Sequence, residues 1–319
     1  MVSDLASGLS RRGHDVWLYC AEGSDVPGVR LVTVPTPKDA LAALVLPGGP
    51  PPPPAPGVTA AIKAMFGLIS AASFDVVSQH AFDAPAFAFA QDLPVLHTLH
   101  LPPLVPSVVE AAAKVDALKL ATVSRTCRQA WLAAGVEIRH VLPNGVEDLE
   151  IPQQSPAPYA LIAGRISPEK GVEHALAAAG RAGLHVRVAG ALYDPGYVVN
   201  LSTAQLLGML TRVELRRVMA DSLVTICAAR WDEPFGLVAA EAQMAGCPVA
   251  AYRRGALPEV IEDGVSGALA EADNIDSLAG AIRVCQSLDR AGVRSSALRR
   301  LGFEAALDRY ERVLAEVAG

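Results

Sequence analysis

Residues 232–241 read Asp232-Glu233-Pro234-Phe235-Gly236-Leu237-Val238-Ala239-Ala240-Glu241, the most informative stretch of the chain. A carboxylate in a loop precedes a Phe-Gly turn, and an apolar run follows that carries a second carboxylate. Apolar residues continue to Ala245, Gly246 supplies a C-cap, and Pro248 blocks further helix. The pattern predicts a helix over residues 237–245 that begins beside Gly236.

The N-terminus of this helix is predicted to be a ligand site. Its first-turn N–H groups have no intrahelical partner and carry partial positive charge, so they can bind an anion or a hydroxyl-rich ligand. Glu233 precedes this end, and Glu241 lies roughly a turn along the helix. The arrangement disfavours a glycosidase, in which two carboxylates flank one bond about 5–10 Å apart. The alternative interpretation is a capped helix with a solvated glutamate.

The composition bounds the class of protein. A chain of 319 residues with 51% hydrophobic residues favours two domains with sizeable cores. The net charge of −6 and the isoelectric point near 5.7 disfavour nucleic acid or an anionic membrane as partner, because both need a basic face. Five cysteines without metal or disulfide spacing indicate a reducing compartment, and we expect a cytoplasmic protein. We identify neither a signal peptide nor an apolar stretch long enough to span a membrane.

Short apolar runs alternate with helical patterns, which is typical of a parallel α/β protein. The predicted strands are 16–20, 31–34, 75–77, 94–98, 120–123, 138–142, 159–163, 186–189, 223–227 and 249–252. The predicted helices are an N-terminal one that carries Leu5 and Leu9, then 172–179, 213–220, 237–245, a short one opened by Pro258, and a helical tail over 277–317.

Two polar or proline-rich segments interrupt this alternation. Residues 147–158 are rich in Pro and Gln, and we place the domain boundary there. We therefore expect an N-terminal domain over 1–150, a C-terminal domain over 151–300, and a C-terminal helix over 301–319. Five consecutive prolines at 50–54 predict a surface polyproline II loop.

A second candidate site is Gly164-Arg165-Ile166-Ser167-Pro168-Glu169-Lys170-Gly171. A buried strand ends at Gly164, a cation follows, and Ser167 with Pro168 opens a predicted helix that has Lys170 in its first turn. Two cations beside a helix N-terminus suit a diphosphate. Because a cation opposes the helix dipole there, helix stability alone does not explain Lys170.

Candidate residues of the first half follow its strands. His80 comes after strand 75–77 and His100 after strand 94–98, near carboxyl ends where open α/β sheets bind ligands. His97 falls inside an apolar run, which favours a structural role. Ser124 follows strand 120–123, and a helix cap is the alternative to a binding role there.

Several further motifs occur in a fixed order along the chain. They are Thr98-Leu99-His100, Pro143-Asn144-Gly145-Val146, Gly246-x-Pro248-Val249, Gly255-x-x-Pro258-Glu259-Val260 and Asp263-Gly264-x-x-Gly267. With Gly164-Arg165, Lys170-Gly171 and the two glutamates of 233–241, they resemble glycosyltransferase family four. Any single motif is weak, but together they cover almost the whole chain. Members of that family are retaining, nucleotide-sugar-dependent enzymes of the GT-B fold.

The resemblance implies two Rossmann-like domains that face a central cleft, and it implies roles for the candidate residues. Arg165 and Lys170 would hold the donor diphosphate. Glu233, with the backbone of residues 235–237, would hold the transferred sugar, and Glu241 would bind the ribose hydroxyls. His100 would reach the donor sugar from the opposite domain, and a helix near 303–314 would pack back on the first domain. The predicted substrate-binding set is Phe235, Gly236, Leu237, Glu241, Gly164, His80 and Ser124.

The implied reaction moves a sugar from a nucleoside diphosphate sugar of the UDP or GDP type to an acceptor hydroxyl, with retained configuration. No metal and no further cofactor is expected, and we expect a soluble acceptor. Family members usually begin with a strand and a Gly-rich loop before the helix that here starts near Val2, so we expect the first domain to lack its N-terminal strand. Glu147 stands where the family commonly has Asp.

Two rival functions remain open. An isomerase of the same fold, such as a nucleotide-sugar epimerase, would release a new sugar without an acceptor. A catalytically impaired chain would bind nucleotide or a partner protein without turnover.

Overall fold

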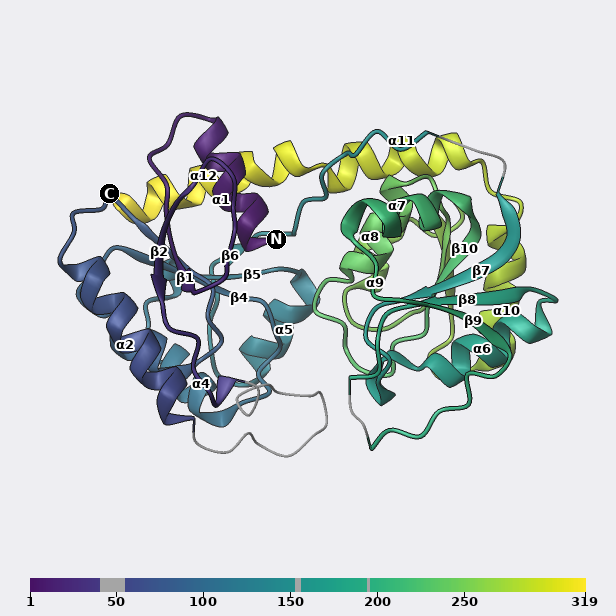
Figure 1. Ribbon diagram of the computed structural model, residues 1–319, viewed down its shortest axis with the longest axis horizontal. Helices are drawn as coiled ribbons and strands as arrows, with labels where there is room; N and C mark the ends of the chain where they lie inside the picture. Colours follow the sequence, from purple (N-terminus) through teal and green to yellow (C-terminus); the bar gives the residue numbers. More distant parts are fainter. Residues whose placement is uncertain (41–54, 153–155, 194–195) are drawn as a thin grey trace. The chain divides into compact units, whose positions relative to one another are not determined.

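The computed structural model describes residues 1–40, 55–152, 156–193 and 196–319 (Figure 1). The chain forms two compact units. Unit 1 comprises Met1–Pro143 with Glu304–Gly319, and unit 2 comprises Asn144–Phe303. The boundary expected after residue 150 therefore lies shortly after the start of unit 2. The polyproline loop predicted at 50–54 lies outside the described residues.

Unit 1 is an α/β unit whose strands form two separate parallel sheets. β1 (Trp17–Ala21) pairs with β2 (Arg30–Val34), and the second sheet has the order β3-β4-β5-β6. The strands of the second sheet are β3 (Val77–Gln79), β4 (Val95–Leu99), β5 (Leu120–Thr122) and β6 (His140–Val141). The helices are α1 (Val2–Arg11), α2 (Pro56–Ser70), α3 (Ala84–Ala88), α4 (Pro106–Ala112), α5 (Arg125–Ala133) and α12 (Phe303–Ala318), with a 3₁₀ turn at Ala117–Lys119.

The two sheets of unit 1 are buried to different degrees. Every residue of β4 is buried, whereas every residue of β1 is only partly buried. Parallel sheets normally have both faces covered by helices. The half-covered β1 agrees with a sheet divided into two parts, and the expected lack of an N-terminal strand stays a prediction.

The C-terminal helix α12 packs within unit 1. Its buried residues Leu307, Tyr310 and Leu314 recur at helical spacing and form an apolar stripe. On its polar side, the Arg12 guanidinium donates to Glu304 Oε2 at 2.6 Å and to Asp308 Oδ1 at 2.8 Å. Segments from the two ends of the chain thus stabilise each other.

The helical tail predicted over 277–317 is three helices rather than one. They are α10 (Ile275–Cys285), α11 (Arg290–Leu301) and α12. Asp289 begins α11 as an N-cap, because its carboxylate accepts from the backbone N–H of Ala291 at 3.2 Å and of Gly292 at 2.9 Å. Gly302 separates α11 from α12.

Unit 2 is a six-stranded, fully parallel sheet with the order β12-β11-β10-β7-β8-β9. The strands are β7 (Ala157–Ala163), β8 (His185–Ala189), β9 (Ala204–Gly208), β10 (Ser222–Cys227), β11 (Val249–Tyr252) and β12 (Gly267–Ala270). The helices are α6 (Val172–Arg181), α7 (Arg212–Asp221), α8 (Leu237–Met244), α9 (Leu257–Val260), α10 and α11. Figure 1 shows α7 and α8 above this sheet and α6 and α10 below it.

The strand order of unit 2 is that of a Rossmann fold. The chain runs outward from β7 through β8 to β9, crosses to β10, and runs outward again to β12. The direction of winding therefore reverses between β7 and β10. Open α/β sheets bind ligands at the carboxyl ends of the strands on either side of such a switch point. The segments after Ala163 and after Cys227 are thus the expected binding segments of unit 2.

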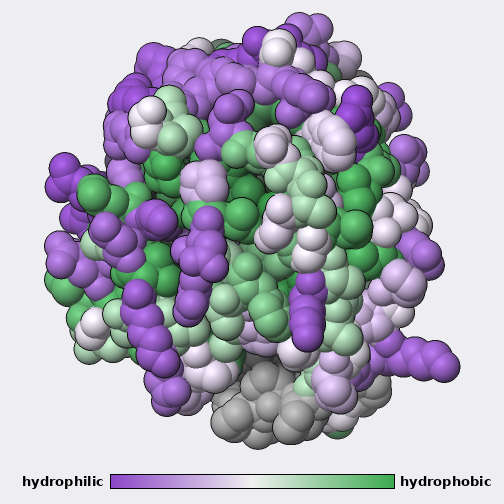
Figure 2. Space-filling model, turned by 90° about the vertical axis from the view of Figure 1, so that its left-hand side faces the viewer, coloured by the Kyte–Doolittle hydropathy of each residue, from purple (hydrophilic) through white to green (hydrophobic). Residues whose placement is uncertain are grey.

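The surface of unit 1 carries both apolar and polar residues. Figure 2 shows one face of unit 1, with hydrophobic residues over its middle and hydrophilic residues along its upper edge. Helix α2 carries one charged residue, Lys63, and exposes Leu68, so it offers no basic face. Among the described residues, no helix combines the length and the apolar character that crossing a bilayer requires.

Candidate functional site

The loop after β7 places two cations at the switch point of unit 2. Gly164, with φ of +116°, ends the strand, and Arg165 follows directly. The Arg165 guanidinium lies 3.5 Å from Glu169 Oε1 and 4.9 Å from the ring centre of Tyr193, and 43% of its side chain is exposed. Arg165 is therefore held loosely, with its charge accessible to a ligand.

Lys170 lies just before α6, whereas the sequence analysis predicted it in the first turn of that helix. Residues Pro168–Lys170 form a 3₁₀ turn, and α6 begins only after the left-handed Gly171. Lys170 thus precedes α6 rather than lying in its first turn. Ser167 donates from Oγ to Glu169 Oε1 at 2.7 Å and makes no side-chain cap.

Glu233, in the loop after β10, meets Lys170 directly. Lys170 Nζ donates to Glu233 Oε2 at 2.8 Å, and Trp231 Nε1 donates to the same oxygen at 2.9 Å. The Lys170 ammonium also lies 5.5 Å from the Trp231 ring centre. The side chains of Lys170 and Glu233 are 24% and 16% exposed, so both keep access to a ligand. The structure therefore joins the two predicted site segments across the switch point.

Gly171 lets these segments approach each other. Its φ is +63°, and a Cβ added there would lie 2.1 Å from the carbonyl oxygen of Ala228, just after β10. An alanine would require both a left-handed backbone and a shift of the neighbouring main chain.

Gly171→Ala is therefore expected to lower the free energy of unfolding of unit 2 by about 3 kcal/mol. Urea unfolding, followed by circular dichroism, measures the loss. The matched control is Gly180→Ala in α6, where an added Cβ has no neighbour within 4 Å. That change should be neutral or stabilise by about 0.5–1 kcal/mol. Equal stability of the two variants would show that the approach of Gly171 to Ala228 does not constrain this loop.

The N-terminus of α8 lies directly beyond Glu233. Phe235 is buried, Gly236 has φ of +93° and acts as N-cap, and α8 starts at Leu237 as predicted. The first-turn N–H groups of α8 and the Glu233 carboxylate thus belong to one short segment. Glu241 lies four residues after Leu237, about 6 Å further along the axis, and is 17% exposed.

Two residues near this site had no assigned role in the sequence analysis. The indole N–H of Trp231 holds the Glu233 carboxylate in place. Cys227 lies at the end of β10, close enough for its ionisation to depend on the charges of Glu233 and Lys170. Burial raises the pKa of the Cys227 thiol to about 12, and the Glu233 charge adds to the shift. Cys227 is therefore protonated at neutral pH and supplies no thiolate nucleophile.

Unit 1 brings His80 and His100 together. His80 Nδ1 lies 2.9 Å from His100 Nε2, their rings stack with centres 5.2 Å apart, and Ser78 Oγ lies 2.9 Å from His80 Nε2. Burial lowers the pKa of His80 to about 3, with a further contribution from His100, and burial lowers the pKa of His100 to about 4. Both imidazoles are neutral at physiological pH, so each ring has one donor and one acceptor nitrogen.

The same shifts predict that acid destabilises unit 1. Between a folded pKa near 3–4 and an unfolded value near 6.5, the unfolded chain binds more protons, so stability falls as the pH drops below 6.5. At pH 5 the loss is expected to be about 2 kcal/mol per histidine. Thermal melts from pH 7.5 to 4.5 measure it, and His80→Asn should flatten the dependence. If the melting temperatures of the wild type and of His80→Asn depend on pH in the same way, His80 and His100 are not a buried, neutral pair.

Two other predicted positions of unit 1 are structural. Ser124 is 1% exposed and caps α5, because its Oγ accepts from the Cys127 N–H at 3.0 Å. The capping alternative therefore accounts for Ser124, and we drop its binding role. His97 stacks on Phe87 with ring centres 4.6 Å apart and contacts Gln79 at 3.2 Å, as its position within an apolar run indicated.

Among the described residues, no three or more His, Cys, Asp or Glu side chains lie close enough together to share a metal ion. The candidate binding groups at the switch point of unit 2 are the cations of 164–171, the carboxylate of Glu233 and the N–H groups of α8. This set suits an anion joined to a hydroxylated group.

Two family profiles together match residues 1–287 of the chain. The Glycosyltransferase Family 4 profile covers residues 1–148, and the profile of glycosyl transferases group 1 covers residues 148–287. The chain belongs to glycosyltransferase family four. The profiles meet close to the start of unit 2, so each of the two units corresponds to one of them.

Curated relatives of this glycosyltransferase family member match it over part of their length. The D-inositol 3-phosphate glycosyltransferase of Mycolicibacterium vanbaalenii is 38% identical over 118 residues, which are 34% of this chain and 26% of that protein. The aligned part of the chain thus spans about a quarter of that relative.

Solved structures match over the whole chain. AviGT4, a glycosyltransferase involved in avilamycin A biosynthesis, has a TM-score of 0.73 at 22% identity and covers 99% of this chain and 88% of its own. Anabaena Alr3699/HepE in complex with UDP-glucose has a TM-score of 0.73 at 18% identity and covers 99% and 94%. The fold class is GT-B, as expected. The predicted cleft concerns the placement of the two units relative to each other and stays a prediction.

Proposed function

We propose that the chain is a retaining glycosyltransferase that moves a sugar from a nucleoside diphosphate sugar to an acceptor hydroxyl. The observation that carries this proposal is the contact of Lys170 Nζ with Glu233 Oε2 at 2.8 Å, beside the N-terminus of α8. A diphosphate needs cations, and a sugar needs hydrogen-bond acceptors and donors. The switch point of unit 2 offers both within one short stretch of surface.

In the proposed step, the bond between the anomeric carbon and the phosphate oxygen breaks, and the electron pair leaves with the diphosphate. A new bond forms from the acceptor oxygen to the anomeric carbon on the same face of the sugar. The acceptor proton passes to the departing phosphate. Arg165, Lys170 and the N–H groups of α8 stabilise the negative charge that develops on the diphosphate.

The remaining residues bind and orient the donor in this proposal. The Glu233 carboxylate accepts hydrogen bonds from the sugar hydroxyls, assisted by the backbone of Phe235, Gly236 and Leu237. Gly164 allows the main chain to come close to the phosphates, and Glu241 accepts from the ribose. In unit 1, the proposed role of His100 rests on the family resemblance, and that of His80 rests on its place near the carboxyl end of a strand. No metal enters the proposed step.

We propose a UDP-type donor ahead of a GDP-type donor. The structure of Alr3699/HepE contains UDP-glucose and its fold resembles this chain, which supports the choice. We propose a soluble acceptor, since α2 lacks a basic face. The five cysteines are free thiols, which supports a reducing compartment such as the cytoplasm.

Donor hydrolysis and transfer test this proposal. The chain is incubated with UDP-glucose, UDP-N-acetylglucosamine and GDP-mannose in EDTA, and the release of UDP or GDP is measured with and without a panel of sugar and polyol acceptors. We expect UDP release from at least one donor, and proton NMR of the product should show the donor's anomeric configuration. Inverted product would contradict the retaining step.

The rival functions give different results in the same experiment. An epimerase would yield a new sugar signal without any acceptor. A nucleotide-binding protein without activity would bind UDP in calorimetry but release none from any donor. Absence of both binding and release would contradict a sugar-nucleotide site altogether.

A further inference from the structure

Arg216 of α7 contacts Glu241 of α8 through two atoms. Its Nη2 lies 3.3 Å from Glu241 Oε1, and its Nη1 donates to the Glu241 carbonyl oxygen at 3.1 Å. Arg216 is 3% exposed, whereas Glu241 keeps 17% of its side-chain surface accessible. One guanidinium thus holds both the main chain and the carboxylate of the same residue from the buried side.

This position is costly for an arginine. Burial lowers the pKa of Arg216, and its Nε lies buried without a hydrogen-bond partner. Its neighbours on the buried face of α7, Met219 and Ala220, are apolar. A buried ion pair is often no more stable than an apolar pair of the same volume. The buried charge of Arg216 therefore adds little to the stability of the fold. Its contact with Glu241 indicates a functional reason for an arginine at this position.

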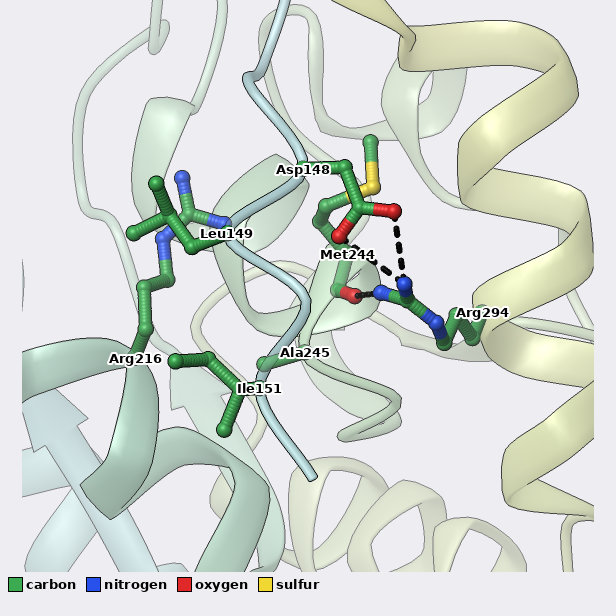
Figure 3. A pocket seen from close by; sticks show the side chains of 7 residues that line it. All are labelled: Asp148, Leu149, Ile151, Arg216, Met244, Ala245 and Arg294. Carbon is green, nitrogen blue, oxygen red and sulfur yellow. Dashed lines mark hydrogen bonds and ion pairs between the residues drawn. The ribbon is translucent and has the colours of Figure 1, made fainter. Parts of the chain in front are cut away.

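A nearby arginine provides a contrast. Arg294 of α11 binds both carboxylate oxygens of Asp148, at 2.8 and 2.6 Å, and the Met244 carbonyl at 2.6 Å. Figure 3 shows this clamp at the edge of a small pocket, with Arg216 across from it beside Leu149 and Ile151. Arg294 connects α11 to Asp148 and to the end of α8, which is a structural role. Arg216 instead contacts the Glu241 carboxylate, which by the family resemblance binds the nucleotide.

We propose that Arg216 is a positioning residue that holds Glu241 by Oε1 so that the second carboxylate oxygen is presented to the ribose hydroxyls of the nucleotide. The inference rests on the proposed function, in which Glu241 binds ribose. A site built to hydrogen-bond a hydroxyl rejects analogues that lack it, provided that its acceptor is held in place. Arg216 therefore contributes to the preference for ribonucleotides.

Calorimetry with UDP, 2′-deoxy-UDP and 3′-deoxy-UDP tests this role. The wild type is expected to bind UDP at least about tenfold more tightly than the weaker of the two deoxy analogues. Arg216→Met should reduce the ratio of the affinities for UDP and for the weaker deoxy analogue to about the ratio measured for Glu241→Gln. Its affinity for the deoxy analogue itself should change little. The double variant should match Glu241→Gln, because the two residues act as one unit. If Arg216→Met weakens all three ligands equally and keeps the ratio, Arg216 is structural and the inference is wrong.

Two further variants separate an effect on the ribose contact from a general loss of stability. Arg216→Lys keeps the charge but cannot reach both acceptors, so its ratio should fall between those of the wild type and Glu241→Gln; an unchanged ratio would overturn the inference. Arg294→Met should lower the melting temperature without changing the ratio. If Glu241→Gln itself leaves the ratio unchanged, the proposed ribose contact fails. If Glu241→Gln changes the affinity ratio but neither Arg216 variant does, the ribose contact of Glu241 stands and only the positioning role of Arg216 fails.

Discussion

Lys170→Ala is expected to weaken UDP binding about 10- to 100-fold, because a charge-assisted hydrogen bond to a phosphate is lost. Transfer should slow by at least about 100-fold, since the same cation stabilises the departing diphosphate. Uridine lacks phosphates and should bind the variant about as well as the wild type. Calorimetry with both ligands and a steady-state assay measure these effects.

The matched control for Lys170→Ala is Arg181→Ala, which removes an exposed cation of α6 that pairs with Asp276. It changes the net charge equally and should leave UDP affinity within about twofold. Equal weakening of UDP and uridine by Lys170→Ala would contradict the phosphate role, because it would indicate a general change in the loop.

Glu233→Gln is expected to reduce turnover about 100-fold while the protein stays folded. The amide has the shape of the carboxylate, but it lacks the negative charge that makes hydrogen bonds from sugar hydroxyls strong. Because the residue lies in a loop and remains 16% exposed, the melting temperature should fall by only a few degrees. A steady-state assay and a thermal melt of the same preparation provide both values.

A graded variant separates the charge of Glu233 from its orientation. Trp231→Phe keeps a ring near Lys170 and removes the N–H that donates to Glu233 Oε2. It should reduce turnover about tenfold, less than Glu233→Gln. A large fall in the melting temperature of Glu233→Gln, in proportion to its loss of activity, would mark Glu233 as a structural residue instead.

The central strands of unit 2 could be predicted because they are continuous apolar runs. β11 was predicted with its observed bounds, and β7 and β10 within two residues. Both edge strands were missed. β12 contains only Gly, Ala and Leu and carries no β-branched residue. β9 pairs with β8 alone and exposes Leu206. An edge strand of this kind has no buried face on either side to impose an apolar pattern.

Helix α2 was missed because apolar residues occur on most of its faces. It carries one charged residue, so its sequence lacks the alternation of polar and apolar faces that signals a surface helix. The helical tail was predicted, but its division into α10, α11 and α12 depends on single residues, such as the capping carboxylate of Asp289 and Gly302.

The candidate site was predictable in its residues but not in its contacts. Lys170 and Glu233 are 63 residues apart, and the sequence suggested separate roles for the phosphate and the sugar. Their direct contact depends on β7 and β10 being neighbours, which is a property of the sheet topology. Arg216 went unnoticed because its role depends on how α7 packs against α8, although a charged residue on an otherwise apolar helix face was a usable signal.

The central claim is that the switch point of unit 2 binds the diphosphate of a sugar nucleotide. A crystal structure of the protein with UDP tests it most directly. We predict phosphate oxygens within hydrogen-bond distance of Lys170 Nζ and the Arg165 guanidinium, and ribose hydroxyls on Glu241. UDP bound elsewhere, with Lys170 still paired to Glu233 and neither residue contacting phosphate, would contradict the account.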